Sequence, residues 1–85
     1  MERKQTMLKL AEDEIKLIAQ RVLSLTQYNI EKEQASGVSE FEAFEVLDLT
    51  SWMCSNPEQQ NFVIREILKS NVLSPRAKEI IRKLS

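Results

Sequence analysis

Apolar and polar residues alternate along the first third of the chain with the repeat of a helix that has one apolar face. The stripe consists of Leu8, Ala11, Ile15, Ile18, Val22 and Leu25, widened by Ala19, Leu23 and Ile30. We expect one long helix over residues 5–35, closed by Gly37, because glycine suits the left-handed residue at a helix end. Mediocre helix formers cluster around Asn29, so a break there is the alternative.

The rest of the chain contains three helix-start motifs, each followed by apolar residues at helical spacing. Ser39 and Glu42 fit a capping box, in which each side chain accepts a hydrogen bond from a free N–H group at the helix start. Asn56 and Ser74 each precede a proline, which is favoured at the first position of a helix. The helices that these motifs predict span residues 40–54, 57–70 and 75–84.

The pattern predicts an all-α protein, a small four-helix bundle forming one helical domain over residues 1–85. Apolar residues occur on nearly every side of the helix at 40–54, so we expect it to be the most central element. The connections are short, so consecutive helices should be neighbours. A first helix of about 45 Å is twice as long as the helices of about 22 Å that follow it, so part of it should overhang.

A second, thinner apolar stripe lies on the opposite side of the long helix, at Leu10, Leu17 and Tyr28. A helix packed on one side does not need it, which favours packing on another chain; burial within the same chain is the alternative. The main stripe also fits a coiled-coil seam with Asn29 as a polar position, although we favour an intramolecular core.

Two further aromatic residues are candidates for a protein interface. Trp52 ends the apolar helix, so we expect it and Met53 in the core; exposed, they would be a binding hot spot. Phe62 points away from the apolar face of its helix, beside Arg65 and Lys69. The candidate interface residues are therefore Leu10, Leu17, Tyr28, Trp52 and Phe62.

Charge is distributed unevenly, with seven acids and one base in residues 31–58, and six bases and two acids in residues 61–85. We expect the two segments to pack together and compensate each other. One alternative is a helix-turn-helix whose second helix, 75–84, binds nucleic acid through Arg76, Lys78, Arg82 and Lys83. The net charge of −1 and the lack of glycine at the turn argue against it. A second alternative is an acidic inhibitor of a nucleic-acid-binding enzyme.

Catalytic chemistry has little basis in this composition. The chain has no histidine and one cysteine, Cys54, so the commonest general base and metal ligand and any multi-cysteine site are absent. We interpret Cys54 as a small buried apolar residue whose pKa acidic neighbours raise. The carboxylates of the helix at 40–54 spread around its axis and indicate a solvated face. We predict no catalytic, cofactor or metal site and no small-molecule substrate.

No run of residues approaches the 18 apolar positions that a membrane span requires, and the first residues carry mixed charge, so we expect a cytoplasmic location and no membrane partner. The function that fits best is a small non-enzymatic protein-binding module, acting as a regulator, adaptor or assembly subunit. We expect its partner to be a second copy in a homodimer, another protein, or both.

Overall fold

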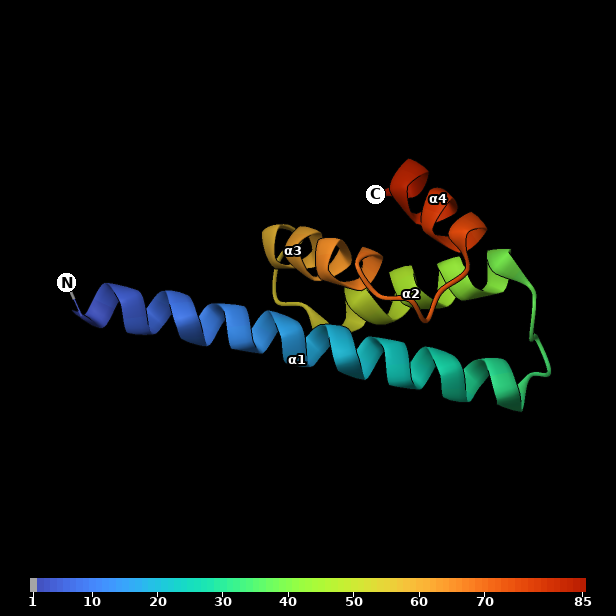
Figure 1. Ribbon diagram of the computed structural model, residues 1–85, viewed down its shortest axis with the longest axis horizontal. Helices are drawn as coiled ribbons and strands as arrows, with labels where there is room; N and C mark the ends of the chain where they lie inside the picture. Colours follow the sequence, from blue (N-terminus) through green and yellow to red (C-terminus); the bar gives the residue numbers. More distant parts are fainter. Residues whose placement is uncertain (1) are drawn as a thin grey trace.

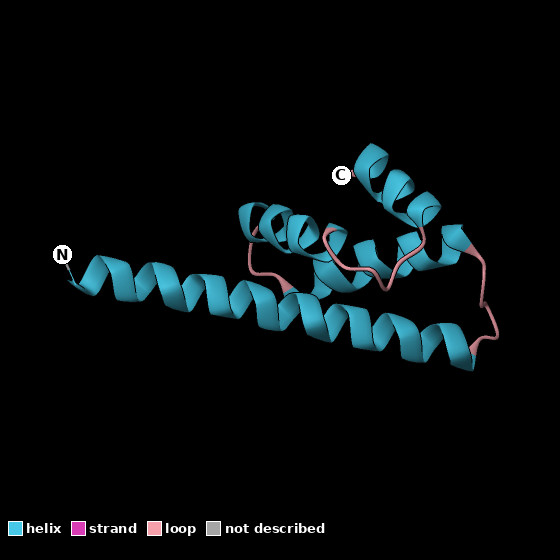
Figure 2. Cartoon of the chain, viewed as in Figure 1, coloured by secondary structure: helices cyan, strands magenta, loops and turns pink. Residues whose placement is uncertain are grey.

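A computed structural model describes residues 2–85 of the chain, and the side chains of residues 12–85. Its helices are α1 (Glu2–Lys32), α2 (Ser39–Met53), α3 (Pro57–Leu68) and α4 (Pro75–Leu84), and residues 2–85 contain no strand (Figure 2). The prediction of an all-α four-helix bundle is confirmed. The expected alternative of a break in α1 is wrong, because the helix runs through Asn29 to Lys32 without interruption.

The helix α2 lies at the centre of the arrangement. It packs against each of the other three helices, whereas α1 packs against α2 and α3, and α4 packs mainly on α2. Figure 1 shows α2 running back along α1, with α4 crossing on the far side of α2. The prediction that this helix is the most central element is therefore confirmed.

The N-terminal part of α1 extends beyond the other helices, and no helix lies beside its first turns in Figure 1. The 31 residues of α1 correspond to about 46 Å, close to the 49 Å longest dimension of the molecule. Because α2, α3 and α4 have 15, 12 and 10 residues, they cannot cover it. The predicted overhang is confirmed.

The core is built from β-branched and small side chains contributed by all four helices. Its fully buried apolar residues include Val22, Val46, Val63, Ile67 and Ile81. Alanines at positions 19, 43 and 77 are buried as well, and small side chains let helix axes approach closely. This packing stabilises the assembly of α1, α2, α3 and α4 around one core.

The core face of α1 is centred on a different residue from the one expected. Leu25, placed in the core stripe by its spacing, is 39% exposed, whereas Thr26 is fully buried. The hydroxyl of Thr26 has no hydrogen-bond partner among the described residues, whereas that of the equally buried Thr50 donates to the carbonyl of Val46 at 2.6 Å. Compared with the orientation expected from the spacing, α1 is therefore rotated about its axis so that Leu25 lies at the edge of the packed face. This orientation buries the Thr26 hydroxyl without a hydrogen bond, which is unfavourable.

The end of α1 is closed by Gln34 and not by Gly37. Gln34 has φ of 54°, its N–H donates to the Glu31 carbonyl at 3.2 Å, and the Ala35 N–H donates to the Ile30 carbonyl at 2.9 Å. These two bonds form a Schellman motif with the left-handed residue at Gln34. Gly37 also has a positive φ, of 85°, but it lies in the following loop, so the prediction that it closes the helix was wrong.

Replacing Gln34 by glycine is expected to raise the free energy of unfolding by about 1 kcal/mol, because glycine adopts this left-handed backbone without strain. Urea unfolding followed by circular dichroism measures the change. Ser36→Gly is the matched control, since Ser36 is an exposed neighbour with a negative φ, where glycine only adds freedom to the unfolded chain. A Gln34→Gly variant less stable than the natural chain would contradict the prediction.

The predicted caps of the two later helices are confirmed. The Asn56 side chain accepts from the Gln59 N–H at 2.8 Å, and the Ser74 hydroxyl accepts from the Ala77 N–H at 3.2 Å. In both helices the following proline occupies the first turn, where its missing N–H costs nothing.

The capping box predicted at the start of α2 does not form. The N-cap residue is Val38, and no side chain caps this end. The Glu42 carboxylate instead accepts from the Ser74 hydroxyl at 2.9 Å, and the Ser39 and Ser74 hydroxyls lie 3.2 Å apart. Because the Ser74 hydroxyl gives its proton to Glu42, Ser39 is the donor in the second contact. These side chains join the starts of α2 and α4 rather than capping α2.

Arg76 extends the same contact, with its guanidinium 3.5 Å from the Glu40 carboxylate. We refer to these five residues, Ser39, Glu40, Glu42, Ser74 and Arg76, as the α2–α4 cluster. Its Arg76–Glu40 contact is the one ion pair among the described residues that joins the acidic and basic segments of the chain. The other two ion pairs among the described residues, Lys69 with Glu66 and Lys83 with Glu79, lie within the basic segment.

Candidate protein-binding face

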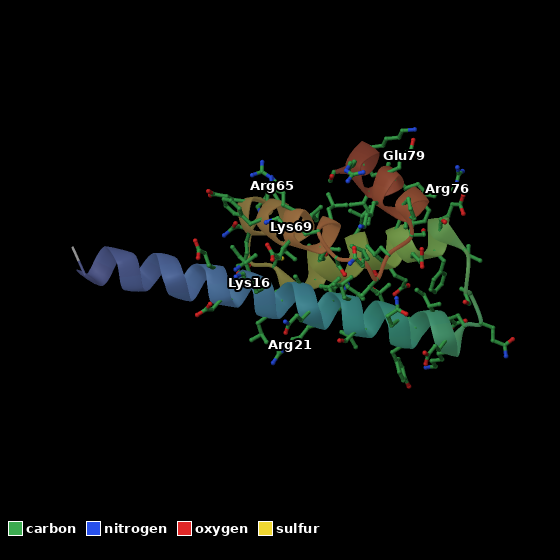
Figure 3. The ribbon with its side chains drawn as sticks, viewed as in Figure 1. Lys16, Arg21, Arg65, Lys69, Arg76 and Glu79 are labelled. Carbon is green, nitrogen blue, oxygen red and sulfur yellow. The ribbon has the colours of Figure 1, made fainter. Side chains whose placement is uncertain are left out.

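One side of α1 carries a row of exposed side chains that point away from the core. The row recurs every three or four residues, and we call it the outer face: Glu14, Leu17, Arg21, Ser24, Leu25 and Tyr28. Leu17 is 50% exposed and Tyr28 is 60% exposed. In Figure 3, Arg21 points away from α2 and α3, which shows the direction of this face. The second apolar stripe expected from the sequence is therefore on the surface at Leu17 and Tyr28, whereas the side chain of Leu10 lies outside the described residues.

A shallow groove adjoins the outer face where α2 ends beside α1. Its volume is about 550 Å³, and its lining consists of Leu17, Gln20, Arg21, Ser24, Leu25 and Met53. Met53 is half-buried and joins the groove to the core cluster. The sequence pattern assigned Leu25 and Met53 to the core. In the structure both lie at the edge of the packed faces of their helices, and they line this groove for that reason.

Trp52 is the most exposed large apolar residue among those described, with 83% of its surface accessible. The interpretation that it packs in the core is wrong. Its helix is apolar on nearly all sides, yet the helices packed around α2 leave Trp52 and Phe44 uncovered. An all-round apolar helix therefore predicts a central position for the helix but not the burial of each residue.

Phe62 lies off the core face of α3, as its spacing indicated. It is 44% exposed, while Val63, Ile64 and Ile67 are buried. The Arg65 guanidinium carbon lies 5.9 Å from the centre of the Phe62 ring, within the range of a cation–π contact. This neighbour shields one side of the ring, so Phe62 offers less free apolar surface than Trp52.

The basic residues of α4 are in part engaged by acids. Arg76 pairs with Glu40, and Lys83 pairs with Glu79 at 3.5 Å; Arg82 is exposed and Lys78 is half-buried. Figure 3 shows Arg76 and Glu79 on this helix. A helix-turn-helix needs α4 to pack on α3, but its main packing partner is α2. Nucleic-acid binding through α4 stays a prediction that this arrangement does not favour.

Three of the acids of α2 contact groups of the same chain. Glu40 contacts Arg76, Glu42 contacts Ser74, and Glu45 accepts from the Asn29 amide at 2.9 Å. The acidic segment is thus partly used to attach α2 to α1 and α4. The alternative that the acidic segment inhibits a nucleic-acid-binding enzyme stays a prediction without a supporting contact.

Reactive groups are few in the described part of the chain. Cys54 is half-buried, and burial raises the pKa of its thiol, so little thiolate exists at neutral pH. The direction agrees with the sequence interpretation, but burial and not the acidic neighbours is the cause. Nowhere among the described residues do three or more metal-binding side chains come together.

A second hollow lies between α1 and α3. It has a volume of about 290 Å³ and is lined by Lys16, Ala19, Gln20, Leu23, Glu66, Lys69 and Ser70. The Glu66 carboxylate there lies 3.5 Å from the Lys69 ammonium group. Figure 3 places Lys16 on α1 beside α3, on the side where Lys69 also lies. The other polar groups of the lining include the Gln20 amide and the Ser70 hydroxyl, which accepts from the Val72 N–H at 3.1 Å.

Within residues 2–85, no helix combines the length and the apolar character that crossing a membrane requires. The chain matches no family model, and comparison with curated proteins and with solved structures gives no match either.

Proposed function

We propose that this protein is a non-enzymatic protein-binding module that self-associates through the outer face of α1. The observation that carries the proposal is the row of Leu17, Leu25 and Tyr28, which are exposed together along one side of a long helix. As a regulator, adaptor or assembly subunit in the cytoplasm, such a module works through the contacts it makes and not through a reaction.

Exposed apolar area along the outer face supports self-association. Single exposed apolar residues are ordinary on protein surfaces, but several of them along one helix face beside a groove are typical of a binding site. Tyrosine is favoured in interfaces because it buries much area with little loss of side-chain entropy. A standard interface buries about 800 Å² on each partner. The helix α1, about 46 Å long, is long enough for a helix-to-helix contact of this size.

Truncating Leu17 and Tyr28 together to alanine is expected to weaken dimerisation at least 10-fold, since each loses apolar area that the complex would bury. Light scattering behind a sizing column, over a wide range of protein concentration, measures the molar mass and hence the dissociation constant. Helicity by circular dichroism should stay unchanged, because both side chains are exposed in the single chain.

Leu84→Ala is the matched control, since Leu84 is a similarly exposed leucine, at 57%, on α4 and away from α1. Its dissociation constant should equal that of the natural chain. A natural chain that remains a monomer at every concentration would contradict the homodimer. Loss of helicity in the double variant would instead show that these residues support the fold.

A further inference from the structure

The outer face carries two opposite charges, one on either side of its central leucine. Glu14 and Arg21 are seven residues apart, which is two helical turns, and Leu17 lies between them. Both side chains are exposed, and neither takes part in the ion pairs found among the described residues. Each charge is therefore free to pair with a group on another molecule.

We propose that α1 pairs antiparallel with α1 of a second copy, around a two-fold axis beside Leu17. The inference rests on the proposed self-association and adds its direction, its register and its specificity residues. A two-fold axis halfway between Glu14 and Arg21 places each Glu14 beside the partner's Arg21, so that two equivalent ion pairs flank the central leucines.

The alternative direction is disfavoured by the same charges. In a parallel pair at equal height, Glu14 would face the partner's Glu14, and Arg21 would face the partner's Arg21. Like charges at such positions repel, and charged flanking residues set helix orientation in this way. The sequence of the outer face thus encodes direction through charge, although its apolar residues alone do not.

The length of α1 agrees with this register. The middle of the helix Glu2–Lys32 is Leu17, so the axis that pairs Glu14 with Arg21 also pairs the two helices over their full length. The N-terminal part of α1, which extends beyond the other helices in Figure 1, then runs beside the outer face of the other copy at Leu25 and Tyr28. The segment left without a neighbour in one chain thereby gains one in the dimer.

Charge reversal tests the register without touching the core. Glu14→Arg alone and Arg21→Glu alone are each expected to raise the dissociation constant about 10-fold at low salt, because two symmetric contacts change from attraction to repulsion. The double variant restores both attractions with the signs exchanged and should return to within about 3-fold of the natural chain. Asp48→Arg, at an exposed acid on α2, makes the same charge change as Glu14→Arg; it is the control for that variant and should have no effect.

A distance measurement tests the direction independently. A spin label at Glu31→Cys, in a Cys54→Ser background, lies at an exposed site near the end of α1. Antiparallel pairing separates the two labels by about 40 Å along the helices, whereas parallel pairing holds them about 10 to 15 Å apart. Pulsed electron spin resonance distinguishes these separations.

The outcomes separate the two proposals. A monomeric natural chain overturns both the self-association and this register. A dimer in which the single reversals have no effect, or the double variant does not recover, overturns the register and leaves the self-association standing. A short distance between the labels overturns the antiparallel direction. Recovery in the double variant together with the long distance supports the proposal.

Discussion

The variant Ile81→Ala is expected to lose about 3 kcal/mol of unfolding free energy, which is a large share of the stability of a domain of this size. Ile81 is fully buried, and its helix α4 is held mainly by packing on α2. Truncation removes most of the largest buried side chain of α4 and leaves a cavity that backbone shifts fill only in part.

Urea unfolding followed by circular dichroism measures this loss, and Ile81→Val, with an expected cost of about 1 kcal/mol, keeps the measurement possible if the alanine variant is unfolded. Ile80→Ala is the matched control, because Ile80 is the adjacent residue and is only half-buried. Equal losses at the two positions would show that Ile81 contributes no more to the packing of α4 than the half-buried Ile80 does.

The second large effect is expected for Ser74→Ala, at about 2 to 3 kcal/mol. The Ser74 hydroxyl caps α4, and its loss as a cap costs about 1 kcal/mol. The same hydroxyl donates to the half-buried Glu42 carboxylate, which would be left without that donor at a further cost of about 1 to 2 kcal/mol.

The variant Asn56→Ala isolates the contribution of the cap. Asn56 also precedes a proline and also caps its helix. Its side chain is exposed, and its hydrogen bond is to Gln59 of the same helix. We expect it to cost about 1 kcal/mol. If both variants cost the same, the α2–α4 cluster adds nothing beyond the cap, and the contact with Glu42 is not a stabilising one.

Much of the fold was predictable from local patterns. The helix Pro75–Leu84 was predicted with its bounds, and the caps at Asn56 and Ser74 were predicted with their roles. These features depend on interactions between residues no more than four positions apart, so they can be predicted from short stretches of sequence. The overhang of α1 followed from helix length alone.

Features that depend on contacts distant in sequence were not predictable. Ser39 and Glu42 have the spacing of a capping box, but Ser74, more than 30 residues away, offers these side chains a partner in α4. The position of Gln34 in a left-handed conformation could not be read from a residue type that rarely adopts it. In each case a long-range contact or a strained residue prevailed over the local preference.

The candidate site was predicted in part. The spacing of Leu17 and Tyr28 identified a second stripe, and the structure places both on the surface. The exposure of Trp52 and Leu25 was missed, because the direction of an apolar side chain on a helix does not say whether another helix covers it. Only the arrangement of α1 and α2 decides that.

The position of α2 at the centre has a consequence for the order in which the chain acquires its structure. The helices α1, α2 and α3 contact one another, so these three can assemble before α4 joins them. The helix α4 packs mainly on α2 and adds Ala77 and Ile81 to the shared core. The docking of α4 is therefore the step that completes the core.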